Sequence, residues 1–308
     1  VFTVSCAGGV RLDCFLPGKQ EPLSGETGYA VTLSGLLGGH SGGDIHRGRA
    51  SANQTMGRVL YSAMERVPGL RVRDIRGGKF DNVICSRNEA LVAVPAGLAK
   101  EFEAFVKEFD GVLKNEYAGC DGGIALSCAG AELDGALSRS ATEHILRTLL
   151  VIPQGVQAMN VDFPGLVQTS LNLGIMGMEA DGLHFSISVR SCIASQKAMM
   201  VQRLRAILEL GGGAVSERSG YPGWQYARQS ALREDVLAAW KAVSGREGKI
   251  EATHGGLECG LFIEKIPGLD AVSMGPELHD VHSVKERLSV PSTKLVYELT
   301  CELLRRSK

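Results

Sequence analysis

The residues best suited to chemistry in this sequence are histidines in glycine-rich segments. His40 lies in LLGGHSGGDIHRG (36–48), directly after the apolar stretch of 29–37. Glycines on both sides let the backbone approach a ligand closely and adopt dihedral angles that other residues avoid. The imidazole could bind a metal, donate a hydrogen bond to a developing oxyanion, or simply occupy a turn. Residue chemistry alone leaves these three readings open.

A second glycine-rich segment, THGGLECGLF (253–262), has a similar character. Gly255 and Gly256 expose backbone N–H groups at the end of an expected strand, and the carboxylate of Glu258 follows. Such N–H groups can form a nest for an oxyanion or a carboxylate. The alternative is an ordinary tight turn between a strand and a helix.

The third segment, GPELHDVHSVKE (275–286), places His279, Asp280 and His282 within four residues. A histidine in such a loop can deliver one ligand to a metal, but a zinc site needs three or four ligands. The sequence holds no second obvious cluster of Asp, Glu and His, and it lacks the H-E-x-x-H motif. Either the other ligands come from elsewhere, or this loop holds no metal.

Hydrophobic spacing predicts an α+β arrangement around the first of these segments. Strands are expected at 28–37, 69–76, 88–95 and 122–128, and helices at 49–67, 97–114, 140–151 and 195–210. QTSLNLGIMGME (168–179) and GLHFSISVR (182–190) predict a hairpin that turns at Asp181-Gly182. His184 and Arg190 fall on the polar face of its second strand.

Gly and Pro in SGYPGWQ (219–225) predict a domain boundary, after which the pattern is that of an α/β layer. We expect a helix around 232–243, strands near 249–254 and 270–275, and a last helix over 292–305 with Ser292 as its N-cap.

Bulk composition excludes several classes of protein. Lys and Arg number 33 against 34 Asp and Glu, so nothing favours a nucleic acid or an anionic membrane as partner. Eight cysteines without a C-x-x-C pair are typical of reduced thiols, and no apolar stretch approaches the roughly 20 residues of a membrane span. We therefore expect a cytoplasmic protein. The sequence opens at Val1 without an initiator methionine, and we expect it to be the C-terminal portion of a longer chain.

Seven motifs, taken together, resemble a known family. In order they are GLLGGHSGGDIHRGRASANQ, GKFDNVIC, QTSLNLGIM, VRSCIAS, GYPGWQ, HGGLECGLF and GPELHDVHS. Over about 5–305 they resemble the aminoacyl-histidine dipeptidases (peptidase D, or Xaa-His dipeptidases), which are dinuclear-zinc metallopeptidases related to carnosinases and carboxypeptidase G. The resemblance implies an α/β catalytic domain, here partial, with an inserted α+β lid domain. Residues 1–25 and 217–308 would be catalytic-domain pieces, and 26–216 the lid and dimerisation domain.

The resemblance also implies roles for individual residues. His40 matches a histidine that stabilises the oxyanion, often from the other subunit of a dimer. Asn82 matches the asparagine of an N-x-I-P segment, and Arg190 matches the arginine that pairs with the substrate's C-terminal carboxylate. Gly255 and Gly256 would line the substrate's end of the catalytic domain.

His282 matches the C-terminal zinc ligand of the family. The other ligands, for two Zn²⁺ ions per active site, and the general-base glutamate lie upstream of the segment that matches CAGG (6–9) and are absent from this sequence. With a single ligand, we expect this chain alone to have little or no activity.

The sequence departs from the family pattern at a few positions. Cys85 stands where proline usually follows Asn-x-Ile, and we expect the loop that holds Asn82 to differ in shape from that of the family. Val284 and Lys285 replace a usual Pro and Asp beside His282, and thereby alter the surroundings of the ligand. Gly255 replaces a common alanine, a change that we expect to be harmless.

The expected function is hydrolysis of dipeptides, with a preference for Xaa-His substrates such as carnosine, by a metal-activated water. The expected assembly is a homodimer joined through the lid, with no nucleic acid or membrane as partner. Two alternatives stand beside this reading: a non-catalytic dimerisation or peptide-binding module, and a related tripeptidase or amidohydrolase.

Overall fold

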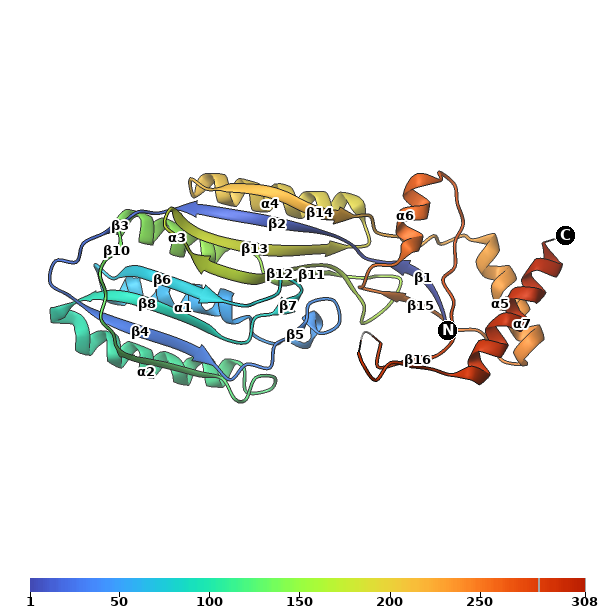
Figure 1. Ribbon diagram of the computed structural model, residues 1–308, viewed down its shortest axis with the longest axis horizontal. Coiled ribbons are helices and arrows are strands. Elements are labelled where there is room, and N and C mark those ends of the chain that lie inside the picture. The colour runs from blue at the N-terminus through green and yellow to red at the C-terminus, as the bar shows by residue number, and fades with distance from the viewer. Residues whose placement is uncertain (282, 308) are drawn as a thin grey trace.

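The computed structural model describes residues 1–281 and 283–307, which form two lobes along the longest axis of the molecule (Figure 1). The chain starts in a small lobe, enters a larger sheet lobe at Gly8 and returns to the small lobe after Tyr221. We refer to residues 8–221 as the sheet lobe and to the remaining described residues as the small lobe.

The sheet lobe is built on a nine-stranded sheet with the order β14-β2-β13-β12-β6-β8-β4-β9, in which β11 also pairs with β12. The strand pairs of this sheet are antiparallel. The strands are β2 (Gly8–Pro17), β4 (Glu26–Ser34), β6 (Arg71–Gly77), β8 (Asn88–Pro95), β9 (Ala125–Gly130), β11 (Gly155–Met159), β12 (Val167–Met178), β13 (Gly182–Ser191) and β14 (Ala214–Tyr221). Two short pairs accompany it: β3 (Gln20–Glu21) with β10 (Ala136–Leu137), and β5 (Gly39–His40) with β7 (Val83–Ile84).

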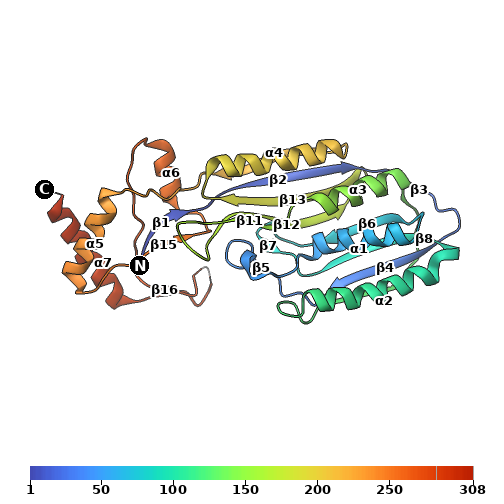
Figure 2. The ribbon, with the colours of Figure 1, turned by 180° about the vertical axis from the view of Figure 1, so that it is seen from behind.

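Four helices cover one face of this sheet and leave the other face open (Figures 1 and 2). They are α1 (Ala52–Arg66), α2 (Ala99–Glu116), α3 (Arg139–Val151) and α4 (Ala194–Leu210). Apolar side chains that recur at helical spacing, among them Met56 and Leu60 in α1, meet alternate residues of the strands such as Leu12 and Leu33. These four side chains are fully buried. This core joins the helices to the sheet, and the loops at the end of the sheet are attached to it.

The small lobe combines parallel β1 (Phe2–Cys6) and β15 (Ile250–Thr253) with three helices. The helices are α5 (Ala231–Ser244), α6 (Glu258–Lys265) and α7 (Val290–Arg306), and a short pair joins β16 (Leu278–His279) to β17 (Arg287–Leu288). Its core is small, and Phe2, Val236 and Leu299 are among its buried members.

Two 3-10 turns in the sheet lobe, η1 (Ile45–Arg47) and η2 (Ala96–Leu98), complete the described elements. No helix among the described residues has the length and apolar character needed to cross a bilayer.

Most of the expected elements are present, and the mixed α/β character is confirmed. The hairpin of β12 and β13 turns at Asp181 as predicted. The expected strand at 270–275 is wrong: only a single bridge joins Ser273 to Thr3, because Gly275 and Pro276 follow and proline cannot continue the hydrogen-bonded ladder. The N-cap prediction for Ser292 is also wrong, since α7 begins at Val290 with Pro291 in its first turn, where proline is tolerated.

Two strands of the sheet include residues outside the range expected for the lid. β2 lies wholly within residues 1–25, and β14 continues to Tyr221, beyond residue 216. The assignment of these lobes to a lid and a catalytic domain stays a prediction.

Candidate functional site

The loop that carries His40 lies at the end of the sheet lobe that faces the small lobe (Figure 1). His40 pairs with Val83 through β5 and β7, and the N–H group of Ser41 donates a hydrogen bond to the Asn82 carbonyl at 2.9 Å. Two predicted site residues, His40 and Asn82, therefore lie side by side although 42 positions separate them in the sequence.

Charged side chains fix the conformation of this loop. Asp44 Oδ2 accepts a hydrogen bond from the His40 N–H group at 2.9 Å, and Arg49 Nη1 donates to the Gly38 carbonyl at 2.6 Å. Asp44 also pairs with Arg47 at 3.0 Å. The carboxylate therefore ties the backbone on which the imidazole is mounted.

The imidazole of His40 has a defined hydrogen-bonding state. Its Nδ1 accepts hydrogen bonds from the N–H groups of Gly42 and Gly43, both at 3.2 Å. A Cβ atom at Gly42 would lie 3.0 Å from the His40 ring, so glycine permits this approach. Partial burial and then the positive charge of Arg190 lower the pKa of His40, while Asp44 acts in the opposite direction. The neutral ring therefore carries its hydrogen on Nε2, which has no hydrogen-bond partner among the described residues and can donate to a ligand.

Arg190 provides a cation that has no carboxylate partner in the part of the chain that the structure describes. In β13 it lies between Gly9 of β2 and Ser170 of β12, and only 9% of the residue is exposed. Nη1 donates a hydrogen bond to the Tyr221 hydroxyl at 3.1 Å, whereas Nε has no partner among the described residues. Arg190 also forms no ion pair within the described chain. A buried guanidinium with donors to spare favours an anionic ligand.

His254 joins the two lobes next to Arg190. Its Nε2 lies 2.7 Å from Ser170 Oγ, across the lobe boundary, and its side chain is buried. Burial and then the charge of Arg190 lower the pKa of His254 to about 4, although the carbonyl of Val167 favours the charged form. The ring is therefore neutral at pH 7.

The loop after His254 places the two predicted glycines at the same boundary. The His254 carbonyl lies against Gly42, 3.4 Å from where a Cβ atom would be. The N–H group of Gly255 donates to Thr253 Oγ1 at 3.2 Å. A Cβ at Gly256 would lie 2.7 Å from the ring of Tyr221.

The structure thus brings five of the six predicted residues to one boundary, and the sixth, His282, lies outside the described residues. Three residues at this boundary received no role from the sequence: Ser170, Tyr221 and His254. The position of His254 directly before the glycine pair was a usable signal. The polar side of the hairpin was a signal for Arg190, but none pointed to its contact with Tyr221.

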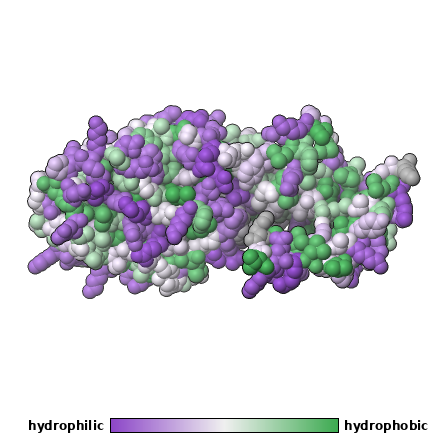
Figure 3. Space-filling model, in the orientation of Figure 1, coloured by the Kyte–Doolittle hydropathy of each residue, from purple (hydrophilic) through white to green (hydrophobic). Residues whose placement is uncertain are grey.

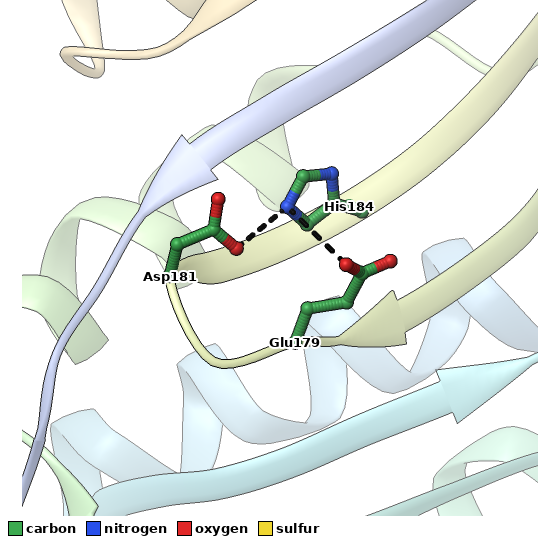
Figure 4. A group of neighbouring side chains, drawn as sticks. All are labelled: Glu179, Asp181 and His184. Atoms are coloured by element: carbon green, nitrogen blue, oxygen red, sulfur yellow. Dashed lines mark hydrogen bonds and ion pairs between the residues drawn. The ribbon is translucent and has the colours of Figure 1, made fainter.

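The described residues around His40 do not form a metal centre. Among the described residues, three potential metal ligands come close to one another at the β12–β13 turn: Glu179, Asp181 and His184 (Figure 4). This turn is at the opposite end of the sheet from the His40 loop (Figure 1). There, His184 Nε2 lies 2.8 Å from Asp181 Oδ1. Glu179 and Asp181 are exposed to solvent, and His184 is half-buried. One ring nitrogen of each nearby histidine is already engaged: His40 Nδ1 by the N–H groups of Gly42 and Gly43, and His254 Nε2 by Ser170 Oγ. A zinc site therefore finds no complete ligand set among the described residues.

The chain resembles known peptidases in sequence. Residues 31–120 match the model of a peptidase dimerisation domain. The chain is 33% identical over 305 residues to the cytosol non-specific dipeptidase of Escherichia coli (strain K12), covering 98% of this chain and 62% of that protein. The resemblance to dipeptidases is confirmed.

A solved structure gives the same picture in three dimensions. The aminoacylhistidine dipeptidase from Vibrio alginolyticus matches with a TM-score of 0.93 and 29% identity, over 99% of this chain and 62% of that one. The chain therefore spans 62% of the length of each of these two relatives.

Proposed function

We propose that this chain belongs to an enzyme that hydrolyses dipeptides with a free C-terminal carboxylate, with a preference for Xaa-His substrates such as carnosine. The observation that carries the proposal is that His40 and Arg190 meet at one boundary. His40 Nε2 and Arg190 Nε are both donors without a partner among the described residues. The names of the two dipeptidase relatives support the same reaction class.

In this proposal each group acts on a different part of the substrate. Arg190 binds the terminal carboxylate through its spare donors. His40 donates from Nε2 to the oxygen of the scissile carbonyl as negative charge develops there, with Asn82 beside it. Gly255 and Gly256 line the end of the site that holds the carboxylate. A site that grips a free terminus at a fixed distance from the reacting carbonyl favours short peptides.

Metal ions would supply the nucleophilic water. We propose two Zn²⁺ ions per site with His282 as one ligand, the remaining ligands being carried by residues other than those described. Because one histidine cannot hold two zinc ions, residues 1–308 alone would turn over little or no dipeptide.

The surface of the small lobe supports the proposal that it is part of a larger catalytic domain, with the sheet lobe as an inserted lid. Several apolar side chains there are exposed, and green residues gather over this lobe in Figure 3. They include Leu261, Phe262, Leu278, Leu288 and Val290. Exposed apolar patches of this kind mark surfaces that further chain or a partner covers.

We also propose that the protein is a cytoplasmic homodimer joined through the sheet lobe. The match of residues 31–120 to a peptidase dimerisation domain supports the dimer, and the cytosolic relative supports the compartment. His40 would act either in its own active site or in that of the partner subunit.

An assay of the intact, zinc-loaded protein tests the reaction class. Carnosine, Gly-Gly-Gly and an N-acyl amino acid serve as three parallel substrates. We expect the highest kcat/KM for carnosine. A preference for the tripeptide or for the N-acyl amino acid would instead favour a tripeptidase or an amidohydrolase, and binding without turnover of any of them would favour a peptide-binding module.

A further inference from the structure

We propose that Tyr221 is a positioning and specificity-determining residue of the carboxylate site, an inference that rests on the function proposed above for Arg190. Tyr221 holds the guanidinium in place from β14. It also offers its own phenol hydrogen to the same carboxylate, so that the two side chains recognise the ligand together.

The contact between the two side chains has a definite direction. Arg190 Nη1 donates to the Tyr221 hydroxyl oxygen at 3.1 Å, because a guanidinium has no acceptor. A phenol that accepts in this way keeps its own hydrogen, and no described residue accepts a hydrogen bond from it. The result is a pair of adjacent donors, O–H and N–H, whose spacing suits the two oxygens of a carboxylate.

Within the described chain, the side chain of Arg190 makes one hydrogen bond, the one to the Tyr221 hydroxyl. The residue is 9% exposed and its Nε has no partner within the described chain. A buried cation that loses its last acceptor is free to adopt other rotamers and is costly to leave unpaired. The hydroxyl of Tyr221 therefore selects the orientation in which the remaining donors of Arg190 face the ligand.

The ring of Tyr221 fits its position because glycines lie on either side of it. A Cβ atom at Gly9 would lie 2.7 Å from Cε1, Cζ and Oη of the ring, and one at Gly256 would lie 2.7 Å from Cε2. Both distances are too short for a real side chain, so each residue has to be glycine while the ring stays where it is. The main-chain carbonyl of Tyr221 also accepts a hydrogen bond from Lys197 Nζ at 2.7 Å.

These contacts connect three separate parts of the chain. Gly9 lies in β2, Tyr221 ends β14, and Gly256 follows β15 in the small lobe. The ring therefore positions Arg190 relative to the loop of Gly255 and Gly256, which lines the same end of the site in the proposed function.

The test is a comparison of carboxylate and amide ligands in the intact, zinc-loaded protein. Calorimetric titration with L-histidine and with L-histidinamide needs no turnover, and carnosine hydrolysis gives KM and kcat. For Tyr221→Phe, which keeps the ring, we expect the preference for histidine over histidinamide to fall about fivefold. The KM for carnosine should rise by a similar factor, with kcat within about twofold of the wild-type value.

Two further variants make the result decisive. Gly9→Ala keeps the hydroxyl but displaces the ring, and we expect the same loss of preference. Tyr226→Phe is the matched control, because Tyr226 contacts Phe163 edge-on at 4.9 Å between ring centroids and does not contact Arg190; its preference should stay at the wild-type value. Thermal melting checks that each variant is folded.

The possible outcomes separate the two proposals. If Tyr221→Phe retains the full preference for histidine, or loses affinity for both ligands equally, the role of Tyr221 is overturned even where carnosine is hydrolysed. If the wild-type protein does not prefer histidine to histidinamide, the carboxylate site itself is wrong. If the preference depends on Tyr221 but no dipeptide is hydrolysed, the present inference stands and the proposed reaction falls.

Discussion

At the scale of single residues, the hydrogen-bonding state of His40 depends on its neighbours. Two glycine N–H groups hold Nδ1 as an acceptor, and the charge of Arg190 contributes to lowering the ring's pKa. A lowered pKa keeps the ring neutral to more acidic pH than an ordinary histidine, so Nε2 remains a neutral donor under physiological conditions.

This coupling predicts a measurable shift. In Arg190→Gln the positive charge near His40 is gone, and we expect the pKa of His40 to rise toward its ordinary value. NMR titration of the His40 ring proton follows this directly. An unchanged pKa in the variant would mean that Arg190 does not act on His40, and that the two groups do not share a site.

At the scale of elements, a buried carboxylate ties both ends of the His40 loop to the sheet lobe. Asp121 is completely buried, and it accepts hydrogen bonds from the N–H groups of Leu37 and Ala50, both at 2.7 Å. An asparagine side chain at this position has only one accepting oxygen. Its NH2 group, which is a donor, would face one of the two backbone N–H groups.

We therefore expect Asp121→Asn to lower the free energy of unfolding by roughly 2 kcal/mol, as measured by urea denaturation. The matched control is Asp134→Asn, because Asp134 pairs with Arg73 with 82% of its side chain exposed and should change stability by less than about 0.5 kcal/mol. Equal effects of the two substitutions would show that Asp121 does not hold the loop.

Sequence patterns predicted elements well where one face of an element is apolar. The helices α1 and α2 have such a face, and the sequence predicted both. β14 was not predicted because it is an edge strand whose residues are mostly exposed, which leaves no alternation to detect. β2 has such an alternation of buried and more exposed residues, but it was not among the predicted strands.

The site was predictable only in part for a related reason. His40, Arg190 and the glycine pair stand out by residue type and local pattern. The contact of Ser170 with His254 joins residues 84 positions apart, and the ring of Tyr221 lies over Gly9 from more than 200 positions away. Such contacts depend on how the two lobes pack, and no local pattern carries that information.

At the scale of the whole molecule, His254 makes the junction of the lobes sensitive to pH. Its pKa is about 4 in the folded protein and near 6.5 for an ordinary histidine. Between these values the unfolded chain binds a proton that the folded protein does not, so stability falls as the pH falls through this range. Above pH about 6.5 the contribution to stability is fully present.

We expect this contribution to be roughly 3 kcal/mol, which is the difference between the two pKa values converted to free energy. The measurement is the free energy of unfolding of wild-type protein and of His254→Asn between pH 4 and 7. The wild type should lose more stability on acidification than the variant does. Parallel curves for the two proteins would contradict a neutral, buried His254.

The central claim is that His40 acts on the substrate and does not bind metal. It is tested most directly by measuring both turnover of carnosine and zinc content in the intact protein with His40→Ala. We predict a loss of at least about 100-fold in kcat with zinc content unchanged, because one oxyanion donor is removed while the metal ligands remain. Loss of zinc together with activity, or full activity without His40, would contradict the account.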